Sequence, residues 1–289
     1  MTAGPDPGRQ GGTPVSSHLS TDGSASRPVT IRDLTTAKEQ GERFVMLTAY
    51  DHPTAQLLEE NGVPVILVGD SVGNNVLGYD STVPVTLDDM LHHTRAVSRG
   101  APMPLVVADL PFGTYQVSAD DGFRAAIRLV KEAGANAVKA EGAGPVIDLA
   151  RRLVGAGIPF MGHLGLTPQS VHQMGYRVQG RDDEGADRLV ADAEALAAAG
   201  AFAIVLEGVP SELGRRVTRA VEIPTIGIGA GPDTDGQVLV IHDLLGLSAG
   251  PHPRFVKAYA DLRSEIGGAI KAFQHEVADG EYPGPEHCY

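Results

Sequence analysis

The sequence predicts an α/β fold, a single closed (β/α)8 TIM barrel, and two observations carry this prediction. Eight short apolar, β-branched segments alternate with amphipathic segments, an order that is typical of a parallel sheet. The apolar segments are continuous, which indicates that both faces of the sheet are covered. The chain has 289 residues, and about 250 residues are typical of one such barrel.

A doubly wound open sheet would show the same alternation of strands and helices. Nucleotide-binding sheets of that class favour a glycine-rich loop after the first strand. Here that loop is Tyr50-Asp51-His52-Pro53, and the chain contains neither GxGxxG nor GxxxxGK(S/T). The closed barrel is therefore the favoured architecture.

Residues 1–29 differ in composition from the rest of the chain. Gly, Pro and Ser occupy 14 of these 29 positions, and large apolar side chains are almost absent. Such a segment buries too little surface to offset the entropy of ordering, so we predict a disordered tail. We expect its deletion to change neither activity nor oligomeric size. The barrel domain is predicted to span 30–289.

The barrel domain is predicted to begin with a helix. Thr30-Ile31-Arg32-Asp33 has the pattern of a capping box, and the helix is expected to end near Gly41. The eight strands that follow are predicted at 44–49, 65–69, 105–109, 137–141, 160–163, 202–207, 225–228 and 238–241.

Capping signals set the limits of the helices between these strands. Thr86-x-x-Asp89 and Ser118-x-x-Asp121 are expected to begin two of them. Glycines just beyond the helical periodicity are expected to end five helices, at Gly62, Gly100, Gly134, Gly157 and Gly200. A last helix is predicted over 254–279, packed either on the barrel or on a neighbouring subunit.

Composition excludes several classes of function. The formal net charge of −13 repels phosphate backbones, so we expect no nucleic-acid partner. The lone cysteine, Cys288, excludes an internal disulfide framework and a cysteine-rich zinc site. No apolar run approaches about 18 residues, and the N-terminus has no secretory pattern. We therefore expect a soluble cytoplasmic protein with no membrane partner.

Titratable side chains end five consecutive predicted strands, and active sites of such barrels lie at the carboxyl ends of the strands. These side chains are Asp70, which Ser71 follows, Asp109, the pair Lys139 and Glu141, His163 and Glu207. The alternative is that each acid caps the next helix. Asp is a favoured N-cap but Glu is a poor one, so capping does not explain all five strands.

Alternation along each strand predicts which way these side chains point. Lys139 and Glu141 are two residues apart, so both should line the mouth of the barrel. By the same rule Asp70 shares a side with Val68, and Asp109 with Val107.

Three carboxylates without a cysteine or a histidine pair predict a hard cation. Mg²⁺ fits Asp70, Asp109 and Glu141 because it takes few carboxylates, keeps waters and binds substrate oxygens. Zinc is disfavoured, since His92 and His93 diverge by about 100° on a predicted helix and are expected at its surface. His163 is as compatible with a capping or core role as with a catalytic one.

A divalent cation beside a lysine and a spare carboxylate predicts enolate chemistry. The cation would polarise a carbonyl, and a carboxylate would take the proton from the adjacent carbon. The substrate expected from this set is a small 2-oxo acid whose carboxylate pairs with Lys139. A Schiff-base role for Lys139 is the rival interpretation.

Several long motifs, from about Thr30 to His287, resemble the ketopantoate hydroxymethyltransferase family. They are Gly69-Asp70-Ser71-Val72-Gly73, Leu77-Gly78-Tyr79, Asp109-Leu110-Pro111-Phe112, Val138-Lys139-Ala140-Glu141-Gly142, Gly162-His163-Leu164-Gly165-Leu166-Thr167-Pro168-Gln169, Leu206-Glu207-Gly208-Val209-Pro210, Thr225-Ile226-Gly227-Ile228-Gly229-Ala230-Gly231, Asp235-Gly236-Gln237-Val238-Leu239-Val240 and Tyr282-Pro283-Gly284-Pro285-Glu286-His287. Gly208 stands where a cysteine is common, and residues 1–29 match nothing in the family.

The resemblance implies a (β/α)8 barrel of the phosphoenolpyruvate mutase and isocitrate lyase group. It implies transfer of a hydroxymethyl group from 5,10-methylenetetrahydrofolate, the co-substrate, to 3-methyl-2-oxobutanoate. The product would be ketopantoate (2-dehydropantoate), in pantothenate biosynthesis, with Mg²⁺ as cofactor. The particle implied is a homodecamer of two five-membered rings.

The resemblance also implies roles for individual residues. Asp70 and Asp109 would bind Mg²⁺, and Glu141 would join them directly or through water. The residues that would contact the oxo acid are Asp70, Ser71, Asp109 and Lys139. Glu207 would be the proton acceptor, and His163 would be a supporting donor.

Three further interpretations stay open. A carbon–carbon lyase acting on a 2-oxo or 2-hydroxy di-acid would use a similar site. A catalytically silent, ring-forming scaffold is the alternative outside enzymology. The segment 164–185 is long for a strand-to-helix loop, and its glycines predict either a lid over the site or a disordered surface loop.

Overall fold

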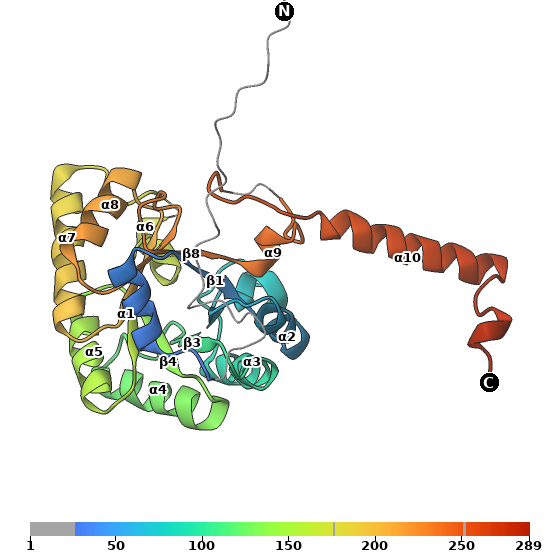
Figure 1. The fold of residues 1–289 in the computed structure, drawn as a ribbon, viewed down its shortest axis with the longest axis horizontal. Helices are drawn as coiled ribbons and strands as arrows, with labels where there is room; N and C mark the ends of the chain where they lie inside the picture. Colours follow the sequence, from blue (N-terminus) through green and yellow to red (C-terminus); the bar gives the residue numbers. More distant parts are fainter. Residues whose placement is uncertain (1–26, 176, 251–252) are drawn as a thin grey trace, which may run out of the picture.

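The structure is a computed structural model, and it describes residues 27–175, 177–250 and 253–289. Its eight parallel strands form a closed barrel in which each strand pairs with the next and β8 pairs with β1 (Figure 1). The strands are β1 (Phe44–Thr48), β2 (Val65–Val68), β3 (Leu105–Asp109), β4 (Ala137–Glu141), β5 (Phe160–Gly165), β6 (Ala203–Glu207), β7 (Thr225–Ile228) and β8 (Gly236–Leu239). The predicted fold class is confirmed.

Helices lie outside the barrel and connect successive strands (Figure 1). The long ones are α2 (His52–Glu60), α3 (Leu87–Gly100), α4 (Ala119–Ala133), α5 (Pro145–Gly155), α7 (Asp183–Ala198) and α8 (Ser211–Ala220). The short ones are the π-helical turn η1 (Gly73–Leu77), η2 (Pro168–Ser170), α6 (Val171–Met174), α9 (Ile241–Leu244) and η3 (Pro285–His287). The predicted caps are confirmed: Thr86 and Ser118 accept the N–H groups of Asp89 and Asp121.

The interior of the barrel forms its own apolar core, and helix α1 (Ile31–Gln40) closes its amino end. Leu34 and Ala37 of α1 are buried in the same cluster as the inward-facing strand residues. Those strand residues are Phe44, Met46, Val65, Leu67, Leu105, Val107, Ala137, Met161, Ala203, Val205, Ile226 and Val238. Apolar side chains of α1 and the strands therefore fill the amino end of the barrel.

Strand β8 begins two residues earlier than predicted. Gly236 pairs with Phe44 on one side and with Ile226 on the other. A Cβ at Gly236 would lie 2.7 Å from Cε2 of Phe44, so a glycine is what lets these strands approach. A glycine and a glutamine at the start of the strand carry no apolar signal, which is why periodicity missed them.

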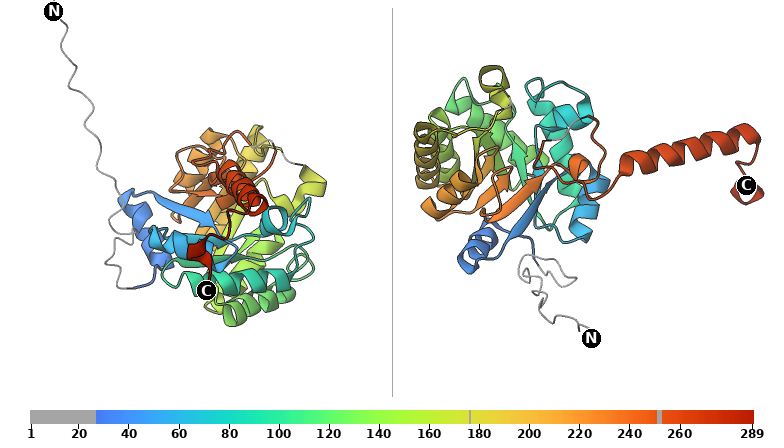
Figure 2. Two further views of the ribbon diagram at one scale, coloured as in Figure 1. Left: turned by 90° about the vertical axis from the view of Figure 1, so that its right-hand side faces the viewer. Right: turned by 90° about the horizontal axis from the view of Figure 1, so that it is seen from above.

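The last helix also differs from its prediction, because α10 (Leu262–Asp279) begins eight residues after 254. Asp261 caps it by accepting from the N–H of Ser264. The segment before the cap is held on the barrel instead, where the N–H of Tyr259 donates to the carbonyl of Leu244 at 2.8 Å. Helix α10 has no buried residue and extends away from the barrel (Figures 1 and 2). Packing of α10 on its own barrel, one of the two predicted arrangements, is therefore wrong.

Most of the predicted tail, residues 1–26, lies outside the described residues. Two of the three residues after it contact the barrel domain: the N–H of Val29 donates to the carbonyl of Met103 at 2.8 Å, and Arg27 pairs with Asp33 at 2.6 Å. The predicted tail boundary at residue 29 is therefore too late, because these contacts include Arg27. In the described part of the chain, no helix combines the length and the apolar character needed to cross a membrane.

Asp33 gives a testable contribution to the stability of the amino end. Its carboxylate accepts from the N–H of Thr30 at 2.7 Å and pairs with Arg27. Because a lost capping contact costs about 1 kcal/mol, Asp33→Ala should lower the free energy of unfolding by about that amount near neutral pH. Urea unfolding of both proteins measures the difference.

The pH dependence of that difference has a defined sign. Its hydrogen bond with Arg27 holds the pKa of Asp33 below its ordinary value. The contribution of Asp33 is therefore fully present above the unfolded-state pKa of about 3.9 and is lost as the pH falls further. The gap between wild type and Asp33→Ala should begin to shrink at about pH 4 and go on shrinking as the pH falls further. A gap that widens on acidification would contradict this account.

Candidate active site

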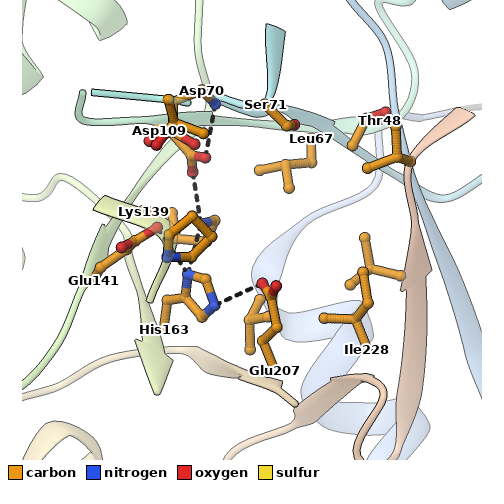
Figure 3. A pocket seen from close by; sticks show the side chains of 15 residues that line it. Thr48, Leu67, Asp70, Ser71, Asp109, Lys139, Glu141, His163, Glu207 and Ile228 are labelled. Atoms are coloured by element: carbon orange, nitrogen blue, oxygen red, sulfur yellow. Dashed lines mark hydrogen bonds and ion pairs between the residues drawn. The ribbon is translucent and has the colours of Figure 1, made fainter. Parts of the chain in front are cut away.

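One cavity of about 110 Å³ lies at the carboxyl end of the barrel (Figure 3). Every site residue predicted from the sequence lines it. The lining residues are Thr48, Leu67, Asp70, Ser71, Thr82, Asp109, Lys139, Glu141, His163, Pro168, Val205, Glu207, Ile228, Val238 and Val240. The charged side chains gather on one side, and Thr48, Leu67 and Ile228 lie on the other.

Strand alternation places five of these side chains. Asp109 points inward with Val107, because the two are separated by one outward residue. The inward pattern that begins at Ala137 continues to Lys139 and Glu141. In the same way His163 follows Met161 and Glu207 follows Val205 into the interior. Alternation therefore determines which core residues these five side chains share a face with, and the packed barrel core shows that this face is the inner one.

Asp70 reaches the cavity by a different route from the one predicted. Val68, with which it was expected to share a side, packs outward in the layer between strands and helices. Strand β2 ends at Val68, so alternation does not extend to Asp70. The turn after Gly69 directs it inward, and its N–H donates to Oδ2 of Asp109 at 3.0 Å.

Lys139 lies among the carboxylates of the cavity. Its Nζ is 2.9 Å from Oδ1 of Asp109, and both side chains are buried. Burial lowers the pKa of Lys139, but the carboxylates of Asp109, Glu141 and Asp70 raise it by more, so the net shift is upward. The lysine is therefore a fixed ammonium, which opposes the unprotonated amine that a Schiff base requires.

His163 is held between two carboxylates. Its Nε2 lies 3.2 Å from Oε2 of Glu207, and its Nδ1 lies 3.5 Å from Oε1 of Glu141. Burial and the nearby Lys139 lower the pKa of His163, but hydrogen bonds to Glu141 and Glu207 raise it to about 9. The ring is therefore the cationic imidazolium at neutral pH, and its N–H groups act as hydrogen-bond donors.

Asp70 carries the clearest sign that the cavity holds excess negative charge. Burial raises its pKa well above the ordinary value, and the carboxylates of Asp109 and Glu141 raise it further. Without an added cation, the charged form of Asp70 is therefore disfavoured. A hard divalent cation would remove this repulsion, and the oxygen donors of Asp70 and Asp109 fit one.

The donor set is incomplete on its own. Across the described residues, no three His, Cys, Asp or Glu side chains are arranged as a ready-made metal site. A cation at Asp70 and Asp109 would therefore take its remaining ligands from substrate and water, as Mg²⁺ commonly does.

His93 was expected at the helix surface, but it is half-buried, with Nδ1 2.6 Å from the carbonyl oxygen of Tyr50.

Strand-end reasoning missed residues supplied by loops. Gln169 of η2 is buried against Asp70, and Tyr115 from the loop before α4 contacts Gln169. Thr82 lines the cavity with a buried hydroxyl that has no partner among the described residues. Ser71 was predicted, but its partner was not: its Oγ lies 2.8 Å from the hydroxyl of Tyr50. No local periodicity marks such residues.

Comparison with known proteins identifies the family. The model of one family, described as ketopantoate hydroxymethyltransferase, matches residues 28–285. The chain belongs to the ketopantoate hydroxymethyltransferase family. It is 57% identical over 265 residues to the 3-methyl-2-oxobutanoate hydroxymethyltransferase of Streptomyces coelicolor, covering 92% of this chain and 91% of that protein. The protein of that name from Moorella thermoacetica is 55% identical, covering 90% and 97%. This chain is thus a transferase, as predicted.

Solved structures from outside this family share the barrel fold of this ketopantoate hydroxymethyltransferase family member. A 2,3-dimethylmalate lyase, titled a member of the PEP mutase and isocitrate lyase superfamily, aligns with TM-score 0.55 and 17% identity, covering 90% of this chain and 91% of that one. A phosphonopyruvate hydrolase in complex with oxalate and Mg²⁺ aligns with TM-score 0.58 and 15% identity, covering 87% and 88%. At these identities the likeness shows the fold alone.

Proposed function

We propose that this chain transfers a hydroxymethyl group from 5,10-methylenetetrahydrofolate to 3-methyl-2-oxobutanoate, in pantothenate biosynthesis. The products are ketopantoate and tetrahydrofolate. The observation that carries the proposal is the cavity itself, where a member of this family brings four carboxylates, a fixed ammonium and a protonated imidazole together. Its small volume and half-apolar lining suit a short branched 2-oxo acid.

The charged side of the cavity would bind the oxo acid. Asp70 and Asp109 would hold Mg²⁺, with Glu141 joining directly or through water. When bound, the cation supplies polarisation of the keto oxygen and stabilisation of the enolate. Lys139 would pair with the substrate carboxylate, and Ser71 would donate a hydrogen bond to it.

Glu207 would take the proton from C3 of the oxo acid. His163 lies 3.2 Å from Oε2 of Glu207, so it would orient the carboxylate while leaving the other oxygen for the proton. One carbon–nitrogen bond of the folate's methylene would break first, which leaves an iminium carbon able to accept a new bond. The electron pair left by breaking the C3–H bond forms that carbon–carbon bond. Water then replaces the second nitrogen, which supplies the hydroxyl oxygen and releases tetrahydrofolate with the remaining proton.

The segment 164–185 would border this reaction. It includes η2 and α6, and Pro168 lines the cavity. The sequence predicts a lid here, and closure over bound substrates remains a prediction.

The reaction is tested directly with the purified chain. With Mg²⁺ and both substrates, mass spectrometry should detect ketopantoate. With Mg²⁺ and the oxo acid alone in D₂O, proton NMR should show exchange at C3. Cleavage of a 2-hydroxy di-acid without either of these results would instead favour the lyase interpretation. Inactivity in every assay would favour the scaffold interpretation.

We also propose that the chain acts as a homo-oligomer, a homodecamer of two five-membered rings. Two unpaired apolar surfaces support association. The outer wall of β8 and β1 has a groove of about 380 Å³ lined in part by Val45, Leu239 and Tyr259. Helix α10 presents half-exposed apolar side chains at the spacing of one helical face, namely Ile266, Ile270, Phe273 and Val277.

Charges placed on the apolar face of α10 should break this assembly. The double variant Ile270→Glu, Phe273→Glu puts two carboxylates where a neighbouring copy would pack, so light scattering should report a smaller particle than wild type. Lys271→Glu with Gln274→Glu, on the same helix turn, is the matched control and should leave the mass unchanged. A wild-type monomer, or an unchanged mass for the first variant, would contradict the proposal.

A further inference from the structure

Gln169 does not line the cavity, yet it contacts two of the carboxylates that do. It lies on η2, between β5 and α7, and only 4% of its surface is exposed. Its Nε2 donates to Oδ2 of Asp70 at 2.7 Å. Its backbone N–H donates to Oε2 of Glu141 at 2.9 Å. One loop residue therefore joins the ends of β2 and β4.

The surroundings of the Gln169 amide permit one orientation. The second hydrogen of Nε2 goes to the carbonyl oxygen of Leu110 at 2.9 Å. Its Oε1 accepts from the hydroxyl of Tyr115 at 2.6 Å and from Nε2 of Gln116 at 3.0 Å. Both donors and both acceptor positions of the amide are thus in use. If the Gln169 amide were flipped, its oxygen would face the Asp70 carboxylate and its NH₂ group would face the NH₂ group of Gln116.

Tyr115 strengthens this restriction. Its hydroxyl oxygen accepts from the N–H of Glu141 at 3.1 Å, so its single hydrogen is left for Oε1 of Gln169. The Tyr115 hydroxyl and the Gln169 amide therefore form one chain of hydrogen bonds from the backbone of Glu141 to the carboxylate of Asp70. Each group in this chain has a fixed role as donor or acceptor.

We propose that Gln169 is a positioning residue for the cation site: it sets the rotation of the Asp70 and Glu141 carboxylates and ties the β5–α7 connection to them. The inference rests on the proposed function, in which Asp70 binds Mg²⁺. Groups that hold metal ligands from behind are needed for affinity, because a ligand that rotates freely must be ordered on binding.

A neutral amide suits this position better than a charged side chain. A lysine at 169 would place a second ammonium beside Asp70 and compete with the cation. A glutamate would add a fifth carboxylate to the set, and as a carboxylate it could not donate to Asp70 as the amide does. The amide donates to Asp70 without adding charge, and it leaves the other carboxylate oxygen to a ligand.

Mn²⁺ serves as the probe for the test, because electron paramagnetic resonance counts free Mn²⁺ without any turnover. Gln169→Asn shortens the side chain by one methylene, so its amide loses Asp70 while the backbone bond to Glu141 stays. The Kd for Mn²⁺, measured with 3-methyl-2-oxobutanoate present, should rise about 10–100-fold. Half-saturation of the reaction by Mg²⁺ should rise likewise, while kcat at saturating Mg²⁺ changes less.

Two further variants make the result decisive. Gln179→Asn is the matched control: it lies in the same connection, its amide donates to the carbonyl of Arg177, and its Kd should stay within twofold of wild type. Tyr115→Phe removes only the hydroxyl that orients Gln169, so it should weaken Mn²⁺ binding less than Gln169→Asn does. If Gln169→Asn fails to fold, the Kd of Tyr115→Phe for Mn²⁺ tests the positioning role of Gln169 instead.

The outcomes separate this inference from the function on which it rests. If wild type binds Mn²⁺ and both folded variants bind it within twofold, Gln169 has no positioning role and the proposed function stands. If wild type binds no Mn²⁺ with the oxo acid present, the cation assignment fails and this inference fails with it. A lower melting temperature with an unchanged Kd would assign Gln169 a purely structural role.

Discussion

Glu207→Gln should lower kcat by about 10²–10⁴-fold, the range expected when a general base is removed. The substitution keeps the shape of the side chain and its contact with His163, but the amide cannot accept the C3 proton. KM for 3-methyl-2-oxobutanoate should change little, because Lys139 and Asp109 stay in place. Steady-state kinetics at saturating Mg²⁺ and folate separates the two constants.

Isotope exchange decides whether the proton step is the one lost. In D₂O, wild type should exchange the C3 hydrogen of the oxo acid, and Glu207→Gln should not. Glu212→Gln, on the exposed surface of α8, makes the same chemical change away from the cavity and should behave as wild type. If Glu207→Gln loses turnover but still exchanges C3, the base must be reassigned, with His163 next in line.

Asp70→Ala should abolish turnover together with its dependence on Mg²⁺. The substitution removes one of the two carboxylates proposed to hold the cation. The fold should persist, because burial and its neighbours already disfavour the charged form of Asp70. Loss of the acceptor for the buried Gln169 amide should cost about 1–3 kcal/mol of stability. Rates measured over a wide range of Mg²⁺ concentration, with a thermal unfolding curve, test both parts.

Asp80→Ala is the control for this variant, since Asp80 lies exposed in the same loop. It should keep the wild-type rate and the wild-type response to Mg²⁺. A near-normal rate for Asp70→Ala at saturating Mg²⁺ would remove Asp70 from the site. A large loss of melting temperature in Asp70→Ala would mean that the carboxylate serves the fold instead.

Local patterns were enough to predict the barrel, its helix caps and the strand ends that carry the charged side chains. Strand alternation is a property of the backbone, so Lys139 and Glu141 share one face of their strand whatever lies around them. Caps are equally local: Thr86 needs only the N–H of Asp89, three residues away. These features depend only on residues that lie close together in the chain, so they can be predicted from the sequence directly.

The assembly of the site depends on contacts between residues far apart in the chain, which local patterns do not show. Asp70 lies beyond the end of its strand, so the loop and Asp109, 39 residues later, set its direction. The side chain of Gln169 contacts Asp70, which lies 99 residues earlier in the chain. This contact occurs once, so no repeating pattern in the sequence predicts it. Helix α10 shows the same limit: its apolar face is visible in the sequence, but only the fold shows that its own barrel does not cover it.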